Sequence, residues 1–396
     1  LSVIVNLGFL GVFKYYNFFA TSFADLINGF GFQVNPLLIK VILPVGISFY
    51  TFHGLSYVID IYYKRIKAET NFIDYSLFVS YFPLLVAGPI ERATHLLPQV
   101  KVKRVFNFQK AKEGIHQIIW GLVKKVVIAD SCAMYANEVF NNHEQMNSLS
   151  LVLGAIYFAF QIYGDFSGYS DIALGTSKLF GIDLLKNFNF PYFSRDIAEF
   201  WRRWHISLSS WFRDYLYIPL GGSKGGKWMQ VRNTFIIFLV SGFWHGANWT
   251  FIAWGLINAI YFLPLLLLNR NRSNIADIDF KWNVEGLQTI LNILLTFSIT
   301  TFAWIFFRAK SISDALLYIK NMFTNLNFDI QYLGNERYAP ELLALVGVFV
   351  VFEWFNKYKT EPISGKYENI KLLFCIMAIL ALGVFSDYKE FIYFQF

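Results

Sequence analysis

The sequence has 396 residues, of which 56% are hydrophobic, 20% aromatic and only 15% charged. A soluble globular protein carries about a quarter charged residues, so this composition excludes an ordinary soluble domain and favours one embedded in a bilayer. The net charge of +7 comes from basic residues clustered between apolar stretches. This pattern is typical of the cytoplasmic loops of a membrane protein, so we expect a lipid bilayer and no nucleic acid around the chain.

Apolar stretches follow one another along the chain, and a membrane-spanning helix needs about 20 such residues. The candidate spans are Leu1–Ala20, Leu37–Tyr62, Tyr75–Pro89, His116–Phe140, Leu149–Gly168, Arg232–Phe243, Thr250–Leu268, Leu287–Phe307, Leu342–Phe355 and Leu372–Phe385. Several are short or interrupted by glycine or proline, which indicates tilted or re-entrant helices around a protein-lined cavity, because irregular backbone cannot face lipid. No linker divides them, so residues 1–396 are predicted to form one multi-pass, all-α membrane domain. Because the chain begins at Leu1 inside an apolar run, we expect further residues before it.

Residues 183–232 break this pattern of apolar spans. The segment combines basic and aromatic side chains, among them Trp201, Arg202, Arg203, Trp204, Trp211 and Arg213. Tryptophan beside arginine is typical of the membrane–water boundary, so the segment is predicted to form cytoplasmic or interfacial helices. Membrane anchoring explains the tryptophans and arginines, but it does not explain the histidine at position 205.

Two of the six histidines stand out, because His205 and His245 are each surrounded by Trp, Ser, Gly or Asn. An imidazole at membrane depth is costly unless it is used or satisfied. Gly242 and Gly246 flank His245 and permit a break in a helix, and a low dielectric favours the neutral imidazole that accepts a proton. We interpret His245 as a general base, with a hydrogen-bonded structural histidine as the alternative. His205 can orient a substrate or simply cap a helix, and His53 is a weaker candidate in an apolar segment.

Asp165 and Asp171 lie in an otherwise apolar run with several hydroxyl side chains. Intramembrane carboxylates usually pair with a cation or line a polar cavity. A proton or sodium pathway is one hypothesis, and a structural network with nearby basic residues is the other.

Other features do not indicate a cofactor or a metal. Residues 221–227 resemble a phosphate-binding loop, but Trp228 replaces the Ser or Thr that holds magnesium, and no strand precedes them. Cys132 and Cys375 have no metal-site spacing and are expected to be packing residues. We therefore expect no bound metal and no resident cofactor.

Longer motifs resemble a known family. They are Phe82–Ile90 (FPLLVAGPI), Tyr163–Asp171 (YGDFSGYSD), Phe200–His205 (FWRRWH), Arg213–Gly222 (RDYLYIPLGG), Phe243–Gly246 (FWHG) and Phe391–Phe396 (FIYFQF). Together they resemble the membrane-bound O-acyltransferase (MBOAT) family, in its bacterial branch of alginate and peptidoglycan O-acetyltransferases and teichoic acid D-alanyl transferases. The resemblance runs over nearly the whole chain.

The resemblance implies a ring of transmembrane helices around a central tunnel that reaches a catalytic histidine. The catalytic positions fall on His245, as base, and on His205, which would support the donor or the developing oxyanion. Arg203, Trp204, Asn248 and Asp165 are expected to contact substrate. The implied reaction moves an acetyl group from cytoplasmic acetyl-coenzyme A across the bacterial inner membrane towards a cell-envelope polysaccharide, through an extracytoplasmic acetyltransferase partner. The alternatives are D-alanyl transfer from a carrier protein to teichoic acid, and an ion-coupled transporter that uses Asp165, Asp171 and His245.

Overall fold

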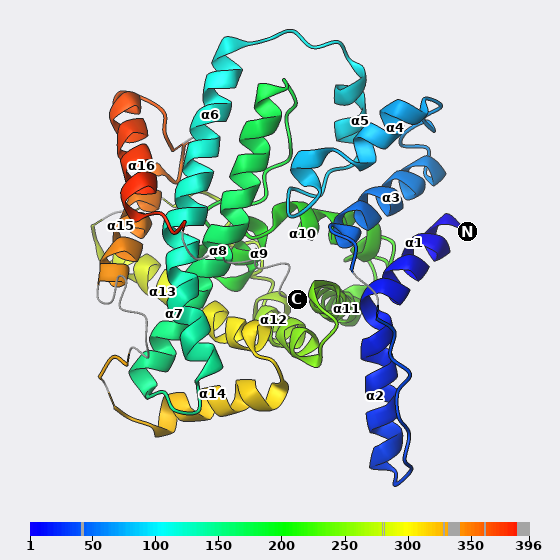
Figure 1. The fold of residues 1–396 in the computed structure, drawn as a ribbon, viewed down its shortest axis with the longest axis vertical. Helices are drawn as coiled ribbons and strands as arrows, with labels where there is room; N and C mark the ends of the chain where they lie inside the picture. The colour runs from blue at the N-terminus through cyan, green and yellow to red at the C-terminus, as the bar shows by residue number, and fades with distance from the viewer. Residues whose placement is uncertain are drawn as a thin grey trace.

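The computed structural model describes residues 1–40, 43–278, 280, 282–327, 329–331, 341–359 and 362–385, and every regular element among them is helical (Figure 1). The all-α prediction is confirmed. The long helical segments are α1–η1–α2 (Ser2–Gly29), α3 (Ile47–Tyr62), α6–η3–α7 (Phe108–Asn141), α8 (Ser148–Leu179), α11 (Gly226–His245), α12 (Trp249–Leu267), α13 (Val284–Arg308), α15 (Glu341–Asn356) and α16 (Glu368–Leu382). Shorter ones are α4 (Phe72–Val79), η2 (Phe82–Leu84), α5 (Ala93–Lys101), η4 (Pro191–Phe193), α9 (Ile197–Arg203), α10 (Ile206–Phe212), η5 (Arg213–Tyr217) and α14 (Ile312–Thr324).

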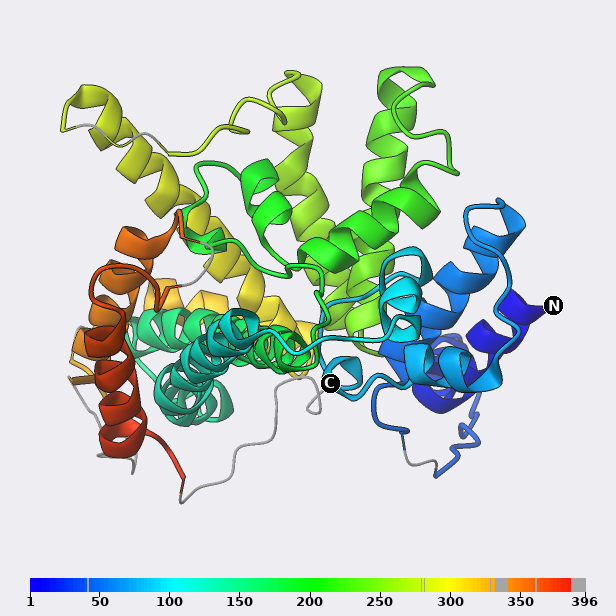
Figure 2. The same ribbon diagram turned by 90° about the horizontal axis from the view of Figure 1, so that it is seen from above.

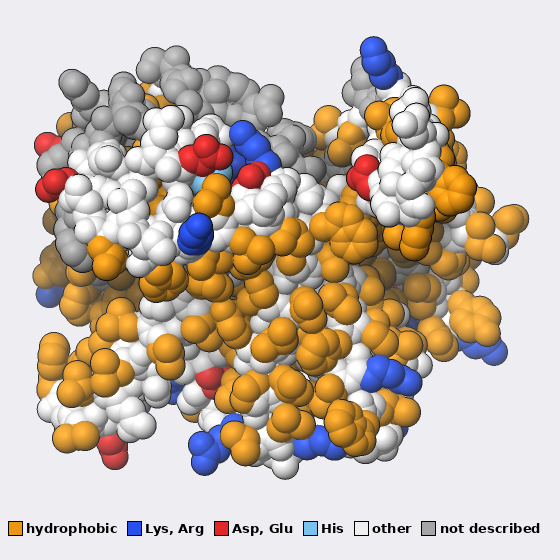
Figure 3. Space-filling view, turned by 90° about the horizontal axis from the view of Figure 1, so that it is seen from below, with side chains coloured by type: hydrophobic (Ala, Val, Ile, Leu, Met, Phe, Trp, Pro, Cys, Tyr) orange, Lys and Arg blue, Asp and Glu red, His pale blue; other side chains and the backbone are white. Residues whose placement is uncertain are grey.

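Four of the described helical segments are long and apolar enough to cross a membrane: Ser2–Gly29, Ser148–Leu179, Trp249–Leu267 and Val284–Arg308. Figure 3 shows hydrophobic side chains covering much of one face of the molecule. Leu291 on α13 and Phe23 on α2, for example, are 56% and 61% exposed. A soluble protein rarely exposes so much contiguous apolar surface, so these side chains face lipid.

The central helix pair, α6 and α8, packs through glycines on both helices. A Cβ at Gly114 would lie 2.6 Å from the carbonyl oxygen of Gly175, and one at Gly121 would lie 2.6 Å from that of Gly168. The reverse contacts are equally close, at 2.4 Å and 2.8 Å. Lipid supplies no hydrophobic force between helices, so small residues that let two backbones touch are the usual means of association. The two antiparallel helices run side by side in Figure 1.

A second glycine pair joins α11 to α12 and fixes the helix that carries His245. A Cβ at Gly242 would lie 2.2 Å from the carbonyl oxygen of Phe251, and one at Gly255 would lie 2.3 Å from that of Phe238. Because Gly242 is three residues before His245, this contact sets the depth of the imidazole between the two helices.

The connections between helices gather on two faces. The described residues of 62–71, 102–107, 180–196, 218–225, 268–283 and 357–367 form one face, which we call the basic face. Side-chain contacts join several of them, as where Arg104 donates to the carbonyl of Phe180 at 3.4 Å and Arg195 donates to that of Ala276 at 2.6 Å. Every one of these connections contains Lys or Arg.

The opposite face is formed by the described residues of 30–46, 142–147, 246–248, 309–311 and 325–331. Contacts again join neighbours, as where Asn248 donates to the carbonyl of Lys310 at 2.9 Å and Asn325 donates to that of Met146 at 3.0 Å. Among their described residues these connections contain only Lys40 and Lys310 as basic residues. The positive-inside tendency predicts that the basic face is the cytoplasmic one.

The structure corrects three sequence-based expectations. The stretch Tyr75–Pro89 is not one span, because α4 ends at Val79 and η2 covers only Phe82–Leu84. The stretch Leu37–Tyr62 is not one span, because helix α3 begins only at Ile47, after Gly46 with a φ of 77°. The tryptophans of 183–232 were expected to anchor at the membrane boundary, yet Trp204 is 2% exposed and Trp211 is 7% exposed, whereas Trp228 is 85% exposed. Trp204 and Trp211 belong to the core that surrounds the histidines. The motif Phe391–Phe396 lies outside the described residues.

We predict that Gly175→Ala lowers the stability of the protein, because the new methyl group must separate α8 from the backbone of α6. Overpacking of this kind costs about 1–3 kcal/mol, measurable as a lower melting temperature in detergent. Gly347→Ala on α15 is the matched control, since nothing lies within 4 Å of its Cβ position. It should be neutral or stabilising by about 0.5–1 kcal/mol, from helix propensity alone. Equal effects of the two substitutions would show that the glycine contact does not hold the helices together.

Candidate active site

His245 is the last residue of α11, and its side chain is buried at 8% exposure. The rings of Trp254 and Phe307 lie edge-on with centroids 5.3 Å away, so aromatic surfaces on α12 and α13 fix the imidazole plane. The chain then leaves the helix through Gly246, whose Cβ would lie 2.0 Å from the ring of Phe251. The His-Gly pair in the sequence therefore reflects a backbone that passes directly over an aromatic ring, where no side chain fits.

A partly buried lysine completes the end of this helix. The Nζ of Lys14 donates to the carbonyl oxygens of Trp244 at 2.8 Å and His245 at 3.2 Å, and it lies 3.4 Å from the Oγ of Ser48. The last carbonyls of a helix have no partner within the helix, and a cation there also complements the helix dipole. The N-terminal span thus positions the imidazole of His245.

His205 is held by a chain of hydrogen bonds that starts at a distant backbone group. The N–H of Ile90 donates to the Oγ of Ser207 at 2.9 Å, and that hydroxyl donates to the Oδ1 of Asn187 at 2.7 Å. The same Oδ1 lies 3.0 Å from the Nδ1 of His205, while the Nδ2 of Asn187 donates to Ser170 at 3.1 Å. Since Oδ1 only accepts, Nδ1 of His205 carries the proton. The Nε2 of the neutral imidazole is then left with its lone pair.

The backbone of His205 is strained, with a φ of 44° and a ψ of 55°. A left-handed conformation in a non-glycine residue costs of order 1–3 kcal/mol and persists only where its surroundings enforce it. Here the backbone bonds from Ile206 to Asn187, at 2.8 Å, and from Asn189 to Arg203, at 2.9 Å, hold both sides of the residue. The strain turns the imidazole inward, against the edge of Phe166 at 4.6 Å.

Two cavities meet at the histidine pair, and both are lined by His205, Leu208 and His245. The larger, about 460 Å³, extends to Arg213, Ser223 and Arg272 on the basic face, and we call it the basic-face cavity. The smaller, about 200 Å³, extends past Lys14 to Leu43–Phe49, next to the opposite face, and we call it the opposite-face cavity. The two imidazole centroids are 6.5 Å apart, too far for a direct hydrogen bond but close enough to share one hydroxyl group.

The other residues expected to contact substrate do not all lie here. Trp204 lines the basic-face cavity, whereas Arg203, Asn248 and Asp165 line neither cavity. Asn248 caps α12 by accepting from the N–H of Thr250 at 3.1 Å. Asp165 pairs with Lys125 at 2.7 Å. Their contacts favour structural roles for these two residues.

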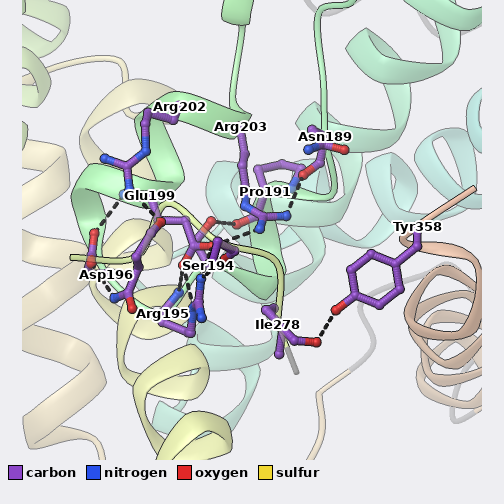
Figure 4. Close-up of polar contacts among 12 residues, drawn as sticks. Asn189, Pro191, Ser194, Arg195, Asp196, Glu199, Arg202, Arg203, Ile278 and Tyr358 are labelled. Carbon is purple, nitrogen blue, oxygen red and sulfur yellow. Dashed lines mark hydrogen bonds and ion pairs between the residues drawn. The ribbon is translucent and has the colours of Figure 1, made fainter. Parts of the chain in front are cut away.

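Arg203 belongs to a buried network around Glu199 (Figure 4). Its Nη2 lies 2.8 Å from the Oε1 of Glu199, and its Nη1 donates to the carbonyl of Asn189 at 3.2 Å. Arg195 binds the same carboxylate in bidentate fashion, with its Nη2 donating to Oε1 at 2.9 Å and its Nε donating to Oε2 at 3.0 Å. Two guanidinium groups therefore neutralise one buried carboxylate beneath the helix that leads to His205.

The described residues contain no group of three His, Cys, Asp or Glu side chains arranged to hold a metal ion. The site consists of two imidazoles, their positioning partners and two cavities. Such an arrangement can deprotonate a hydroxyl group that enters from one side while a second reactant enters from the other.

A model of the membrane-bound O-acyltransferase family matches residues 62–307. The chain belongs to this family. It is 38% identical to a probable alginate O-acetylase of Pseudomonas aeruginosa over 92% of this chain and 68% of that protein. It is 39% identical to a peptidoglycan O-acetyltransferase of Helicobacter pylori over 87% and 67%, and 29% identical to a teichoic acid D-alanyltransferase of Bacillus subtilis over 67% and 69%. The resemblance in the motifs is thus confirmed, and the chain is a membrane-embedded acyltransferase, not an ion-coupled transporter.

Two site residues of this MBOAT protein were missed by sequence reasoning. Asn187 stands in no motif that was considered, and Lys14 lies outside the matched family segment, in an N-terminal apolar helix. A lysine inside an apolar span is itself a signal, since an intramembrane charge usually has a partner or a function. Asn187 carries no comparable signal, because an asparagine between apolar residues is equally typical of a turn.

We predict that Asn187→Ala lowers acyl transfer by roughly 10- to 100-fold, the range seen when a residue that orients a functional histidine is removed. Asn187→Asp should retain more activity, because its carboxylate still accepts from Nδ1 of His205 and from Ser207. Exposed Asn142→Ala is the control and should leave the rate unchanged. Equal losses in the Ala and Asp variants would show that acceptance by Oδ1 is not what matters.

We predict opposite phenotypes for two arginines. Arg203→Leu should lower the melting temperature and leave the KM for the acyl donor unchanged in the folded fraction, because Arg203 contacts Glu199 and no cavity. Arg213→Leu, which lines the basic-face cavity, should raise that KM at unchanged stability. A raised KM in Arg203→Leu without loss of stability would place Arg203 in the donor site.

Proposed function

We propose that this protein transfers an acetyl group from acetyl-coenzyme A, on the cytoplasmic side of the bacterial inner membrane, to a hydroxyl acceptor on the opposite side. The acceptor belongs to an extracytoplasmic partner that passes the acetyl group to a cell-envelope polysaccharide such as alginate or peptidoglycan. One observation carries the proposal: cavities from the two faces converge on the same pair of histidines.

The basic-face cavity fits the donor. Its volume of about 460 Å³ falls within the roughly 300–1,000 Å³ of typical small-molecule sites. Arg213 and Arg272 at its wall complement the phosphates of a coenzyme A, and Trp204 and Phe238 supply apolar surface for the pantetheine arm. The thioester end would then lie beside His245.

The opposite-face cavity fits the acceptor hydroxyl. His245 would take the proton of this hydroxyl as its oxygen attacks the thioester carbonyl carbon. The carbon–sulfur bond then breaks, and the coenzyme A sulfur leaves with the proton that His245 returns. General base assistance of this kind contributes typically 10²–10⁴-fold, and holding both reactants at one point supplies much of the remainder.

The hydrogen bonds of His205 support a different role from the stabilisation of an oxyanion that the resemblance implies. A neutral imidazole whose Nδ1–H is held by Asn187 has only a lone pair at Nε2, so it cannot donate to an oxyanion. It can accept a hydrogen bond from the acceptor hydroxyl. We propose that His205 orients the hydroxyl, and through it the proton, towards His245.

Acetyl transfer is favoured over D-alanyl transfer by the relatives. The matched O-acetylase and O-acetyltransferase are 38% and 39% identical to this chain over most of its length, against 29% over 67% of it for the D-alanyltransferase. A carrier-protein donor would also have to dock on the basic face, whereas a free coenzyme needs only the cavity.

The proposal predicts that His245→Ala lowers acetyl transfer by about 10²- to 10⁴-fold, the range of a lost general base. The measurement uses purified protein with radiolabelled acetyl-coenzyme A and a hydroxyl acceptor, and follows label in the acceptor. His143→Ala is the control, because His143 lines neither cavity of the pair.

Three outcomes are informative. Full activity in His245→Ala with none in His205→Ala would reverse the roles of the two histidines. Transfer from a D-alanyl carrier protein, but not from acetyl-coenzyme A, would replace the donor. If the acceptor is labelled at the wild-type rate in both His245→Ala and His205→Ala, neither histidine takes part in catalysis.

A further inference from the structure

A third cavity, of about 190 Å³, lies on the far side of Asn187 from His205, between α6, η3, α8 and the start of the connection after α15. It reaches the basic face at Lys178, Lys186 and Lys359, and its inner wall holds Lys124, Asp171 and Glu353. Among the described residues, the lining therefore carries four ammonium groups against two carboxyl groups. We call it the lysine cavity.

The acidic groups of the lysine cavity already have partners within the protein. Asp171 pairs with Lys124 and accepts from Gln117 at 3.0 Å. Glu353 accepts from the hydroxyl of Tyr163 at 2.9 Å and 3.0 Å. The excess of positive charge thus lies towards the mouth, where the lysines come from three separate segments of the chain.

Two polar atoms in the wall are buried and have no hydrogen-bond partner among the described residues. They are the Oγ of Ser167, in a side chain 1% exposed, and the Oε1 of Gln117, in one 8% exposed. An unsatisfied buried polar group costs about 1–3 kcal/mol, so such groups in a native protein indicate a missing partner. Both residues line the lysine cavity, so the missing partner belongs inside it.

We propose that the lysine cavity binds an anionic phosphate ester from the cytoplasmic side, supplied by the headgroup of an anionic phospholipid. Lysine binds phosphate as a point charge, and basic pockets between membrane helices on the cytoplasmic side suit lipid headgroups. The phosphate lies at the lysines of the mouth. The two hydroxyl groups of a glycerol headgroup beyond it donate to the open acceptor atoms of Ser167 and Gln117.

The size of the cavity excludes the acyl donor as its occupant. A site for a whole nucleotide-containing molecule needs roughly 300 Å³ or more, and the lysine cavity is about 190 Å³. The basic-face cavity has that room. The two sites are also separated by Asn187, whose oxygen faces His205 while its Nδ2 bonds Ser170 in the wall of the lysine cavity. The proposal is therefore independent of which acyl donor the enzyme uses.

The test measures the melting temperature of the full chain in nanodiscs, without any acyl transfer. One set contains phosphatidylcholine alone, a second contains phosphatidylcholine with phosphatidylglycerol, and a third contains phosphatidylcholine with millimolar inorganic phosphate at matched ionic strength. We expect phosphatidylglycerol to raise the melting temperature of the wild type by roughly 2–4 °C. Native mass spectrometry should show retained phosphatidylglycerol on the same sample.

The variants separate this site from general attraction to a charged membrane. K178Q/K186Q should abolish the rise, whereas K178R/K186R should keep it and shows that the positions tolerate substitution. K103Q removes an exposed lysine of the same face that does not line the lysine cavity, so the rise in melting temperature should persist in this variant. Ser167→Ala should reduce it without changing any charge.

Each outcome decides the proposal. A rise with inorganic phosphate alone, lost in K178Q/K186Q, supports the phosphate site and assigns it to free phosphate instead of lipid. An equal rise in the wild type, K103Q and K178Q/K186Q overturns the proposal, because attraction to the membrane surface would then explain it. No rise with either ligand in the wild type also overturns it.

Discussion

Two imidazoles can lie inside an apolar helical domain because the polar groups around them have partners within the protein. For His205 the partner is the amide of Asn187, which is itself fixed by Ser207 and Ser170. For His245 it is the end of α11, whose carbonyls are bonded by Lys14. In water each of these hydrogen bonds would contribute little to stability. In an apolar interior without competing donors, losing one partner leaves a buried polar group unsatisfied, which is costly in free energy. The site is therefore as rigid as the helices that supply these partners.

Those helices are held at the required distances by glycine. The pairs Gly114–Gly175 and Gly121–Gly168 bring α8 against α6, and α8 carries Ser170, which bonds Asn187. The contact of Gly242 with the backbone of Phe251 sets α11 against α12 (Figure 2). Helix packing and the position of each histidine are thus parts of one arrangement.

Sequence alone predicted the helical class and most of the apolar helices, and it proposed His245 as the base, which stays a prediction. Those predictions depend on the apolar composition, on the length and spacing of the apolar stretches, and on the free-energy cost of an imidazole at membrane depth. It could not predict the support of His205, because the bond from Ile90 to Ser207 joins residues 117 positions apart. The motif that contains Ile90 is recognisable in the sequence. Its contact, a backbone N–H that donates to Ser207, can be seen only in the folded chain. Trp204 and Trp211 were misread for a related reason, since an aromatic side chain near arginine fits a membrane boundary and a buried core equally well, and only burial separates the two cases.

The fixed tautomer of His205 makes the two histidines unequal, although both are buried and both line the same two cavities. His205 presents a lone pair whose direction is fixed by three residues behind it. His245 is positioned through its backbone carbonyl, which Lys14 bonds, and between the rings of Trp254 and Phe307. A hydroxyl group that enters between the two imidazoles therefore meets a fixed acceptor at Nε2 of His205 and lies beside the imidazole of His245. We propose from this arrangement, together with the family motif around His245, that His245 is the base and that His205 aligns the hydroxyl.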